Sequence, residues 1–122
     1  MATSIVSIDV PTGLTRYNET DLNETKSAVK ASSGTLHAIV ADNSANAAAS
    51  YLKLWDVASG SVTVGTTAPD WVFKIPASTK RTIVFQEGAA FATALTAACV
   101  TGAGTAGVTG PTSDFAVDIL FA

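Results

Sequence analysis

The chain of 122 residues has room for one domain and is too short for two full hydrophobic cores. Charged residues make up only 14% of it, against about 25% in an average soluble domain, so its surface is weakly charged. With a net charge of −3 and Lys80-Arg81 as the only adjacent basic pair, the sequence argues against nucleic-acid binding. No apolar run reaches the ~18 residues of a membrane helix, and the single cysteine excludes an internal disulfide.

The N-terminal part of the chain differs in pattern from the rest. Its apolar side chains precede a turn signal, Pro11-Thr12-Gly13, and a polar stretch that ends at Lys26. We interpret residues 1–26 as an extended arm that leads into one domain over residues 27–122. The alternative is that these residues form a first edge strand of the domain itself. The arm residues expected to contact a partner are Ile5, Val6, Ile8, Val10 and Tyr17.

From residue 27 onward, short segments suited to strands alternate with Gly, Pro, Asn and Asp. The expected strands are residues 27–31, 35–41, 51–57, 71–75, 80–85, 93–101 and 114–121. Residues 45–49 are rich in alanine but too short for an independent helix, so we expect a loop with at most one helical turn. This spacing predicts an all-β fold with almost no helix, an antiparallel β-sandwich or a jelly-roll-like barrel.

Alternation within these segments assigns side chains to faces, because successive residues of a strand point to opposite sides. Two apolar sets are expected to form the core: Trp71, Phe73 and Ile75, opposite Lys74, and Phe115, Val117, Ile119 and Phe121, opposite Asp118.

The segment 51–55 is read in the same way. Leu52 and Leu54 share a face and oppose Lys53, so they are expected in the core. Tyr51 and Trp55 then lie on the lysine side. We therefore expect these two aromatic residues to be exposed or to meet a partner.

The glycine-rich stretch Gly102-Ala-Gly104-Thr-Ala-Gly107 has the spelling of a dinucleotide-binding fingerprint. That site needs a helix directly after the glycines and an acidic residue about 20 residues further on. Here the following Val-Thr-Gly-Pro begins no helix, and only fifteen residues remain after Gly107. We interpret the stretch as a flexible connection between strands.

Other chemistry-bearing residues are few. One histidine, His37, and one cysteine, Cys99, cannot supply a structural zinc site or a blue-copper site. Cys99 lies in an apolar strand and is expected to be a small buried side chain. Asp42, Asp56 and Asp114 stand beside turn residues, where aspartate bonds nearby backbone amides. We predict no enzymatic activity, no cofactor, no metal site and no small-molecule substrate.

Four segments carry a resemblance to a known group of proteins. They are Tyr51-Leu-Lys-Leu-Trp-Asp-Val57, Val64-Gly-Thr-Thr-Ala-Pro69, Gly88-Ala-Ala-Phe-Ala-Thr-Ala-Leu95 and Thr101-Gly-Ala-Gly104. This pattern resembles small β-sandwich virion proteins of tailed bacteriophages, including cyanophages. The resemblance covers about residues 35–121 and leaves the arm out. It departs from the group at Ala94, where glycine is commoner.

The resemblance implies a head decoration (cement) protein that binds the outer capsid surface and bridges capsid subunits. It further implies a homotrimer whose partners are the major capsid protein and its own copies, with neither nucleic acid nor membrane as partner. The protein would be made in the host bacterial cytoplasm and end up on the virion. The alternative is a tail, neck or fibre component that binds a carbohydrate or receptor, with Tyr51 and Trp55 stacking on sugar rings.

Overall fold

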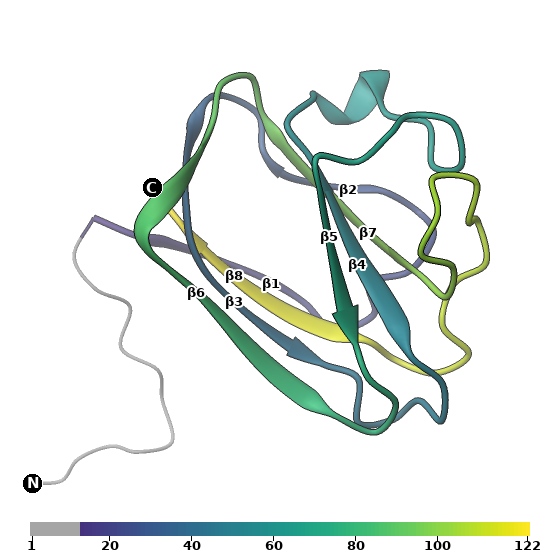
Figure 1. Ribbon diagram of the computed structural model, residues 1–122. Coiled ribbons are helices and arrows are strands. Elements are labelled where there is room, and N and C mark those ends of the chain that lie inside the picture. Colours follow the sequence, from purple (N-terminus) through teal and green to yellow (C-terminus); the bar gives the residue numbers. More distant parts are fainter. Residues whose placement is uncertain (1–12) are drawn as a thin grey trace, which may run out of the picture.

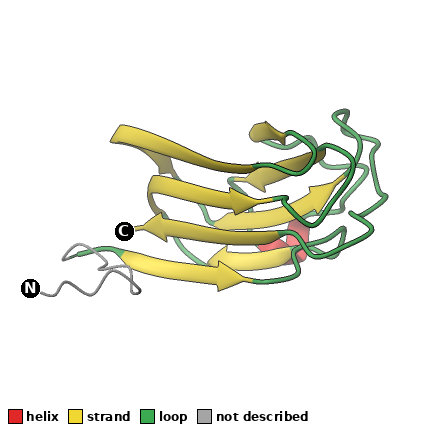
Figure 2. Cartoon of the chain, turned by 90° about the horizontal axis from the view of Figure 1, so that it is seen from below, coloured by secondary structure: helices red, strands yellow, loops and turns green. Residues whose placement is uncertain are grey.

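The computed structural model describes residues 13–122. Two antiparallel four-stranded sheets pack face to face (Figure 1), which confirms the predicted all-β sandwich. Seen from below (Figure 2), the strands form two layers, and the described residues contain one 3-10 turn, η1 (Ser59–Ser61). In spatial order, sheet A consists of β1 (Thr15–Glu19), β8 (Ala116–Phe121), β3 (Gly34–Asp42) and β6 (Lys80–Phe91). Sheet B consists of β2 (Ser27–Lys30), β7 (Leu95–Val100), β4 (Ser50–Trp55) and β5 (Trp71–Ile75).

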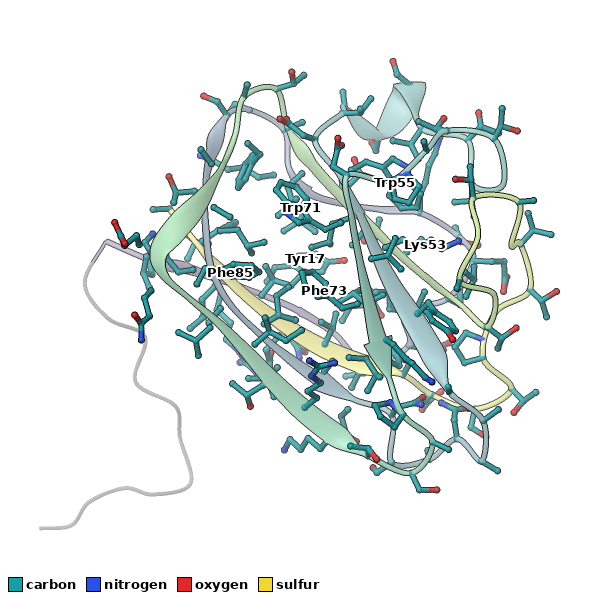
Figure 3. All side chains as sticks on the ribbon, in the orientation of Figure 1. Tyr17, Lys53, Trp55, Trp71, Phe73 and Phe85 are labelled. Carbon is teal, nitrogen blue, oxygen red and sulfur yellow. The ribbon has the colours of Figure 1, made fainter. Side chains whose placement is uncertain are left out.

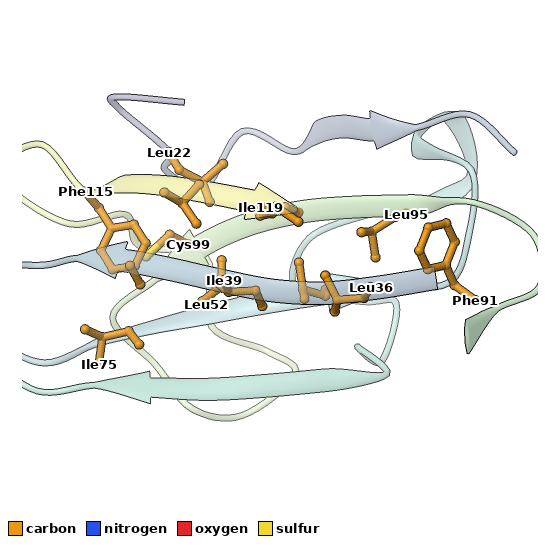
Figure 4. Packing of buried hydrophobic residues seen from close by; sticks show 14 residues of the cluster. Leu22, Leu36, Ile39, Leu52, Ile75, Phe91, Leu95, Cys99, Phe115 and Ile119 are labelled. Atoms are coloured by element: carbon orange, nitrogen blue, oxygen red, sulfur yellow. The ribbon is translucent and has the colours of Figure 1, made fainter. Parts of the chain in front are cut away.

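The core lies between the inward faces of the two sheets, and Figure 4 shows how its side chains meet. The alternation predicted for the last strand is confirmed, because the four residues that it assigns to the core are buried: Phe115, Val117, Ile119 and Phe121. Leu52 and Leu54 of β4 are buried as well. Cys99 is buried beside them on β7, as expected. The largest fully buried residues of this cluster are Leu22, Leu36, Ile39, Leu52, Leu54, Ile75, Phe91, Leu95, Phe115 and Ile119.

Strand β6 is longer than the sequence pattern predicts. Glu87-Gly88 is typical of a strand end, yet β6 continues to Phe91. Gly88 adopts a φ of 79°, and the register with β3 shifts between Leu36 and Ala38. The glycine therefore marks a β-bulge, which bends the strand without ending it.

The predicted boundary between arm and domain at residue 26 is wrong for the described residues. β1 pairs with β8 from Thr15, opposite Phe121, to Glu19, opposite Val117. Leu22 is 2% exposed and belongs to the core. The alternative of a first edge strand therefore holds for this part of the chain. The partner contacts expected of four aliphatic residues lie outside the described residues: Ile5, Val6, Ile8 and Val10.

Two long loops, residues 56–70 and 101–113, extend from strands of sheet B, and we call them the loop layer. They cover the outward face of sheet B and enclose a second small core. That core contains Trp55, Val62 and Ala98 as buried residues. The domain thus has a third, irregular layer on one side.

Candidate interaction surface

The position of Trp55 corrects the expectation that it is exposed. Its side chain points away from the main core, as alternation requires, but only 1% of it is accessible. The indole N–H donates to the Thr67 carbonyl over 2.9 Å. The loop layer therefore buries a tryptophan that would otherwise face solvent. Tyr51, on the same strand, is half-buried.

Lys53 is also covered by the loop layer. It is 1% exposed, and its ammonium donates to the Gly104 carbonyl of the glycine-rich loop. Desolvation lowers the pKa of Lys53 below its ordinary value. The glycine-rich stretch forms no helix and lies over a buried lysine, which fits a connecting loop.

Tyr17 contacts its own domain. Its ring is half-buried and packs against the main core, and its hydroxyl is paired with the Ser27 hydroxyl. Because Tyr17 lies on β1 and Ser27 on β2, this bond joins the two sheets along one side of the sandwich.

Of the aspartates that the sequence places at turns, Asp42 bonds a nearby residue as predicted, whereas Asp56 bonds the backbone of a turn that is distant in sequence. The Asp42 carboxylate accepts from the amide and hydroxyl of Ser44, which lowers the pKa of Asp42. The Asp56 carboxylate accepts from the amides of Ala92 and Thr93, each over 2.8 Å. These bonds lower the pKa of Asp56 and tie the loop after β4 to the turn between β6 and β7.

Cys99 and His37 do not come together with other ligand-type side chains. Burial raises the pKa of Cys99 to about 12, so its thiolate is strongly disfavoured at neutral pH. His37 is half-buried at the bulge of β3. Within residues 13–122, no three His, Cys, Asp or Glu side chains are close enough to hold a metal ion.

A buried polar centre around Asn43 was missed from the sequence, where this residue reads as part of a turn. Asn43 is fully buried. Its amide nitrogen lies within 3.1 Å of the Ile75 carbonyl and 3.0 Å of the Pro76 carbonyl. Its oxygen accepts from Asn46 and Ser50. The centre fastens the loop after β3 to the end of β5, and an Asp-Asn-Ser triplet alone gives no sign of this burial.

One side of the sandwich is open. β5 and β6 are edge strands of their respective sheets and lie opposite each other (Figure 3). Phe73 and Phe85 meet edge to face there, with ring centroids 6.0 Å apart. Trp71 and Phe73, which alternation assigns to the core, point inward but are only half-buried, because no further strand among residues 13–122 covers this side. We call the half-buried residues Trp71, Phe73, Ile83 and Phe85 the open side.

The outward face of sheet A has no covering layer in the described part of the chain. One row across it runs from Arg16 through Leu120 and Ala38 to Val84. Val84 is 65% exposed, and Arg16 forms an ion pair with Asp118, with its Nη2 2.7 Å from a carboxylate oxygen. We call this surface the bare face. Its neighbouring row contains Asn18, Asp118, Val40 and Thr82.

The free edge of β6 borders both surfaces. Its middle segment, residues 82–86, carries no charge, whereas Lys80 and Arg81 precede it and Glu87 follows it. The Arg81 guanidinium donates to the Lys74 carbonyl of β5 over 2.8 Å, across the open side. Edge strands without charge, proline or cover are ready to pair with another chain.

A separate hollow of about 290 Å³ lies between residues 24–26 and 62–64. Lys26 closes part of it by donating to the Val62 carbonyl. The hollow contains no cluster of reactive side chains, so the open side, the bare face and the β6 edge form the candidate functional surface.

No family model, curated protein or solved structure matches this chain. Among residues 13–122, no helix is long and apolar enough to cross a membrane.

Proposed function

We propose that this protein is a structural component of a tailed-bacteriophage particle, a decoration protein on the outer capsid surface. In this proposal the protein binds other proteins and catalyses no reaction. Its partners are the major capsid protein and further copies of itself, arranged as a trimer. The resemblance of the Tyr51–Val57 and Gly88–Leu95 segments to virion proteins supports the phage assignment.

The observation that carries the binding role is the β6 side of the domain, which no segment in the described part of the chain covers. Val84 is 65% exposed, the aromatic side chains of the open side are half-buried, and the middle of β6 bears no charge. Monomeric proteins usually protect such an edge with charge, proline or a covering segment. Low charge and an open edge on one side suit a protein that is buried against neighbours in an assembly.

The alternative is a tail or fibre module that binds a sugar through Tyr51 and Trp55, and only one of these two aromatic residues is accessible. Stacking on a sugar ring requires an accessible aromatic face, and Trp55 is buried under the loop layer. Tyr51 alone, half-buried on β4, is a weaker platform.

Copy number tests the proposal. Particles purified from a phage lysate that contains this chain would be analysed by quantitative mass spectrometry, with the major capsid protein as internal standard. A decoration protein is expected at tens to hundreds of copies per particle. A few copies per particle would move the protein to the tail, and its absence from purified particles would contradict a virion role.

A further inference from the structure

At twelve residues, β6 is the longest strand at a sheet edge in the described part of the chain. In the described part of the chain, β6 pairs on one side only, with β3. Its uncharged segment, residues 82–86, is flanked by cations at one end and by Glu87 at the other. An extended peptide of five or six residues fits this window by adding a strand to the sheet.

The chain contains one segment of matching length and pattern beyond the described residues. Residues 5–10 read Ile-Val-Ser-Ile-Asp-Val, with three aliphatic residues at every second position, Val6, Ile8 and Val10. Such a segment presents one apolar side when it is extended. The segment has no proline and one charge, Asp9, near its end.

The length of the connection between residues 5–10 and β1 determines whether this segment can pair with β6 of the same molecule or only with β6 of another copy. The segment connects through residues 11–14 to β1, which lies at the opposite edge of sheet A from β6. Three strand spacings separate β1 from β6, and a strand outside β6 would be a fourth step away, about 19 Å in all. Five Cα–Cα steps join Val10 to Thr15, and they span at most about 18 Å when fully extended. Thr15 also lies at the Ala89 end of β6, because it pairs with Phe121, Phe121 with Leu36 and Leu36 with Ala89. Residues 82–86 are therefore displaced further along the strand. The β6 edge of the same molecule is therefore out of reach.

We infer that residues 5–10 of one copy add an antiparallel strand to the β6 edge of a second copy. The register that suits both strands places Ile8 opposite Ile83 and Val6 opposite Phe85. Because strand periodicity is two, this register turns the aliphatic residues toward the open side of the second copy. Asp9 then lies opposite Thr82 on the outward face, one diagonal step from Lys80, where opposite charges attract.

The β1 edge of the same molecule is within reach of residues 5–10, but it offers a less apolar surface than the β6 edge. The inward positions of β1 are Thr15, Tyr17 and Glu19, and the Tyr17–Ser27 hydroxyl pair already joins the two sheets there. At β6, the added strand would instead cover the half-buried rings of the open side. Burial of apolar side chains contributes about 25 cal/mol for each Å² removed from water, which favours the β6 edge.

This contact is heterologous, because each copy gives a segment and receives one at a different edge. Repetition of such a contact closes into a ring or continues as a filament. The inference goes beyond the proposed function, since strand exchange between copies requires no capsid. Its failure and the failure of the virion role are therefore separate results.

Cysteine cross-linking tests the pairing in the full chain. Ser7→Cys and Val84→Cys are introduced together, because the proposed register places these positions opposite each other on the outward face. The native Cys99 is buried and its pKa is raised to about 12, so it does not compete. Under mild oxidation we expect reducible species at two or more times the 12.4 kDa chain mass. Each single variant is the control and should yield far less of these species.

A second double variant, Ser7→Cys with Asn18→Cys, tests the alternative pairing. Its disulfide would form if residues 5–10 made a hairpin with β1 of the same molecule. An efficient disulfide within one chain of this variant would overturn the inference. Deletion of residues 1–10 supplies the second readout, with circular dichroism to verify that the domain stays folded. Light scattering should give an oligomer for the full chain and a single chain for the truncated form. A full chain that is monomeric at all concentrations, or a truncated form that stays oligomeric, would also overturn it.

Discussion

The outward faces of the two sheets contrast sharply, although both belong to strands with similar alternation. On sheet B, the loop layer buries Lys53 and Trp55 to 1% exposure each. On sheet A, Val84 remains 65% exposed in a row with Ala38 and Leu120. The difference comes from the connections, because the two long loops leave strands β4 and β7 of sheet B and fold back over it. Loop length and origin therefore decide which face of this sandwich is left for a partner.

The largest expected effect concerns the covered side. Trp55→Ala should lower the free energy of unfolding by about 3–5 kcal/mol, because it removes a fully buried ring and the indole bond to Thr67. Val84→Ala on the bare face should change it by less than about 0.5 kcal/mol. Urea unfolding of both variants measures the difference. Equal losses would remove the contrast between the two faces.

A second comparison sets the buried Asn43 against Asn18 of the bare face. Asn43→Ala leaves several buried groups without partners, including the carbonyls of Ile75 and Pro76. Each unpaired buried group costs ~1–3 kcal/mol, so we expect a loss of about 2–3 kcal/mol. Asn18→Ala, at an exposed position, should cost far less. Thermal and urea unfolding measure both losses. If the two variants lose the same stability, the Asn43 centre does not fasten the loop.

A smaller effect is the pH dependence contributed by Lys53. Its folded-state pKa is lowered by desolvation below the ordinary value of 10.5, so the unfolded chain binds more protons in the interval between the two pKa values. The contribution of Lys53 to the free energy of unfolding therefore rises with pH toward 10.5 and is least favourable at neutral pH.

Lys53→Met removes this dependence and should leave stability at neutral pH unchanged or improved, as expected for a buried charge replaced by an apolar group. The free energy of unfolding of the wild-type chain should increase relative to that of Lys53→Met as the pH rises. Cys99 is present in both proteins and cancels in the difference. Lys74→Met, at an exposed lysine, is the matched control. A flat difference between the wild-type chain and Lys53→Met would show that the lysine is solvated.

Much of the fold was predictable because strand periodicity is local. Alternation placed Phe115 and Ile119 in the core and gave β5 its bounds. It also separated Leu52 from Lys53 correctly, yet it could not show that Lys53 would be covered, because the covering loop lies about fifty residues further along the chain. The outcome at Lys53 depends on a contact distant in sequence.

The candidate surface was less predictable for the same reason. Residues 15–19 are polar on both sides, so only their pairing with β8, about a hundred residues away, makes them a strand. Trp71 has the pattern of a core residue, but it lies on an edge strand and stays half-buried. A pattern within one strand cannot state whether that strand is central or at an edge.

The most direct test of the account compares the same substitution on the two sides of the molecule. Val84→Glu places a negative charge on the bare face beside the β6 edge, one diagonal step from Asp9 of the added strand, where like charges repel. Val108→Glu places the same charge in the loop layer, where the valine is 54% exposed. Light scattering over a range of concentrations measures the assembly state of both variants and of the wild-type chain. We predict that Val84→Glu reduces assembly to single chains, whereas Val108→Glu assembles as the wild-type chain does. Equal assembly of the two variants would contradict the assignment of the bare face as the binding surface.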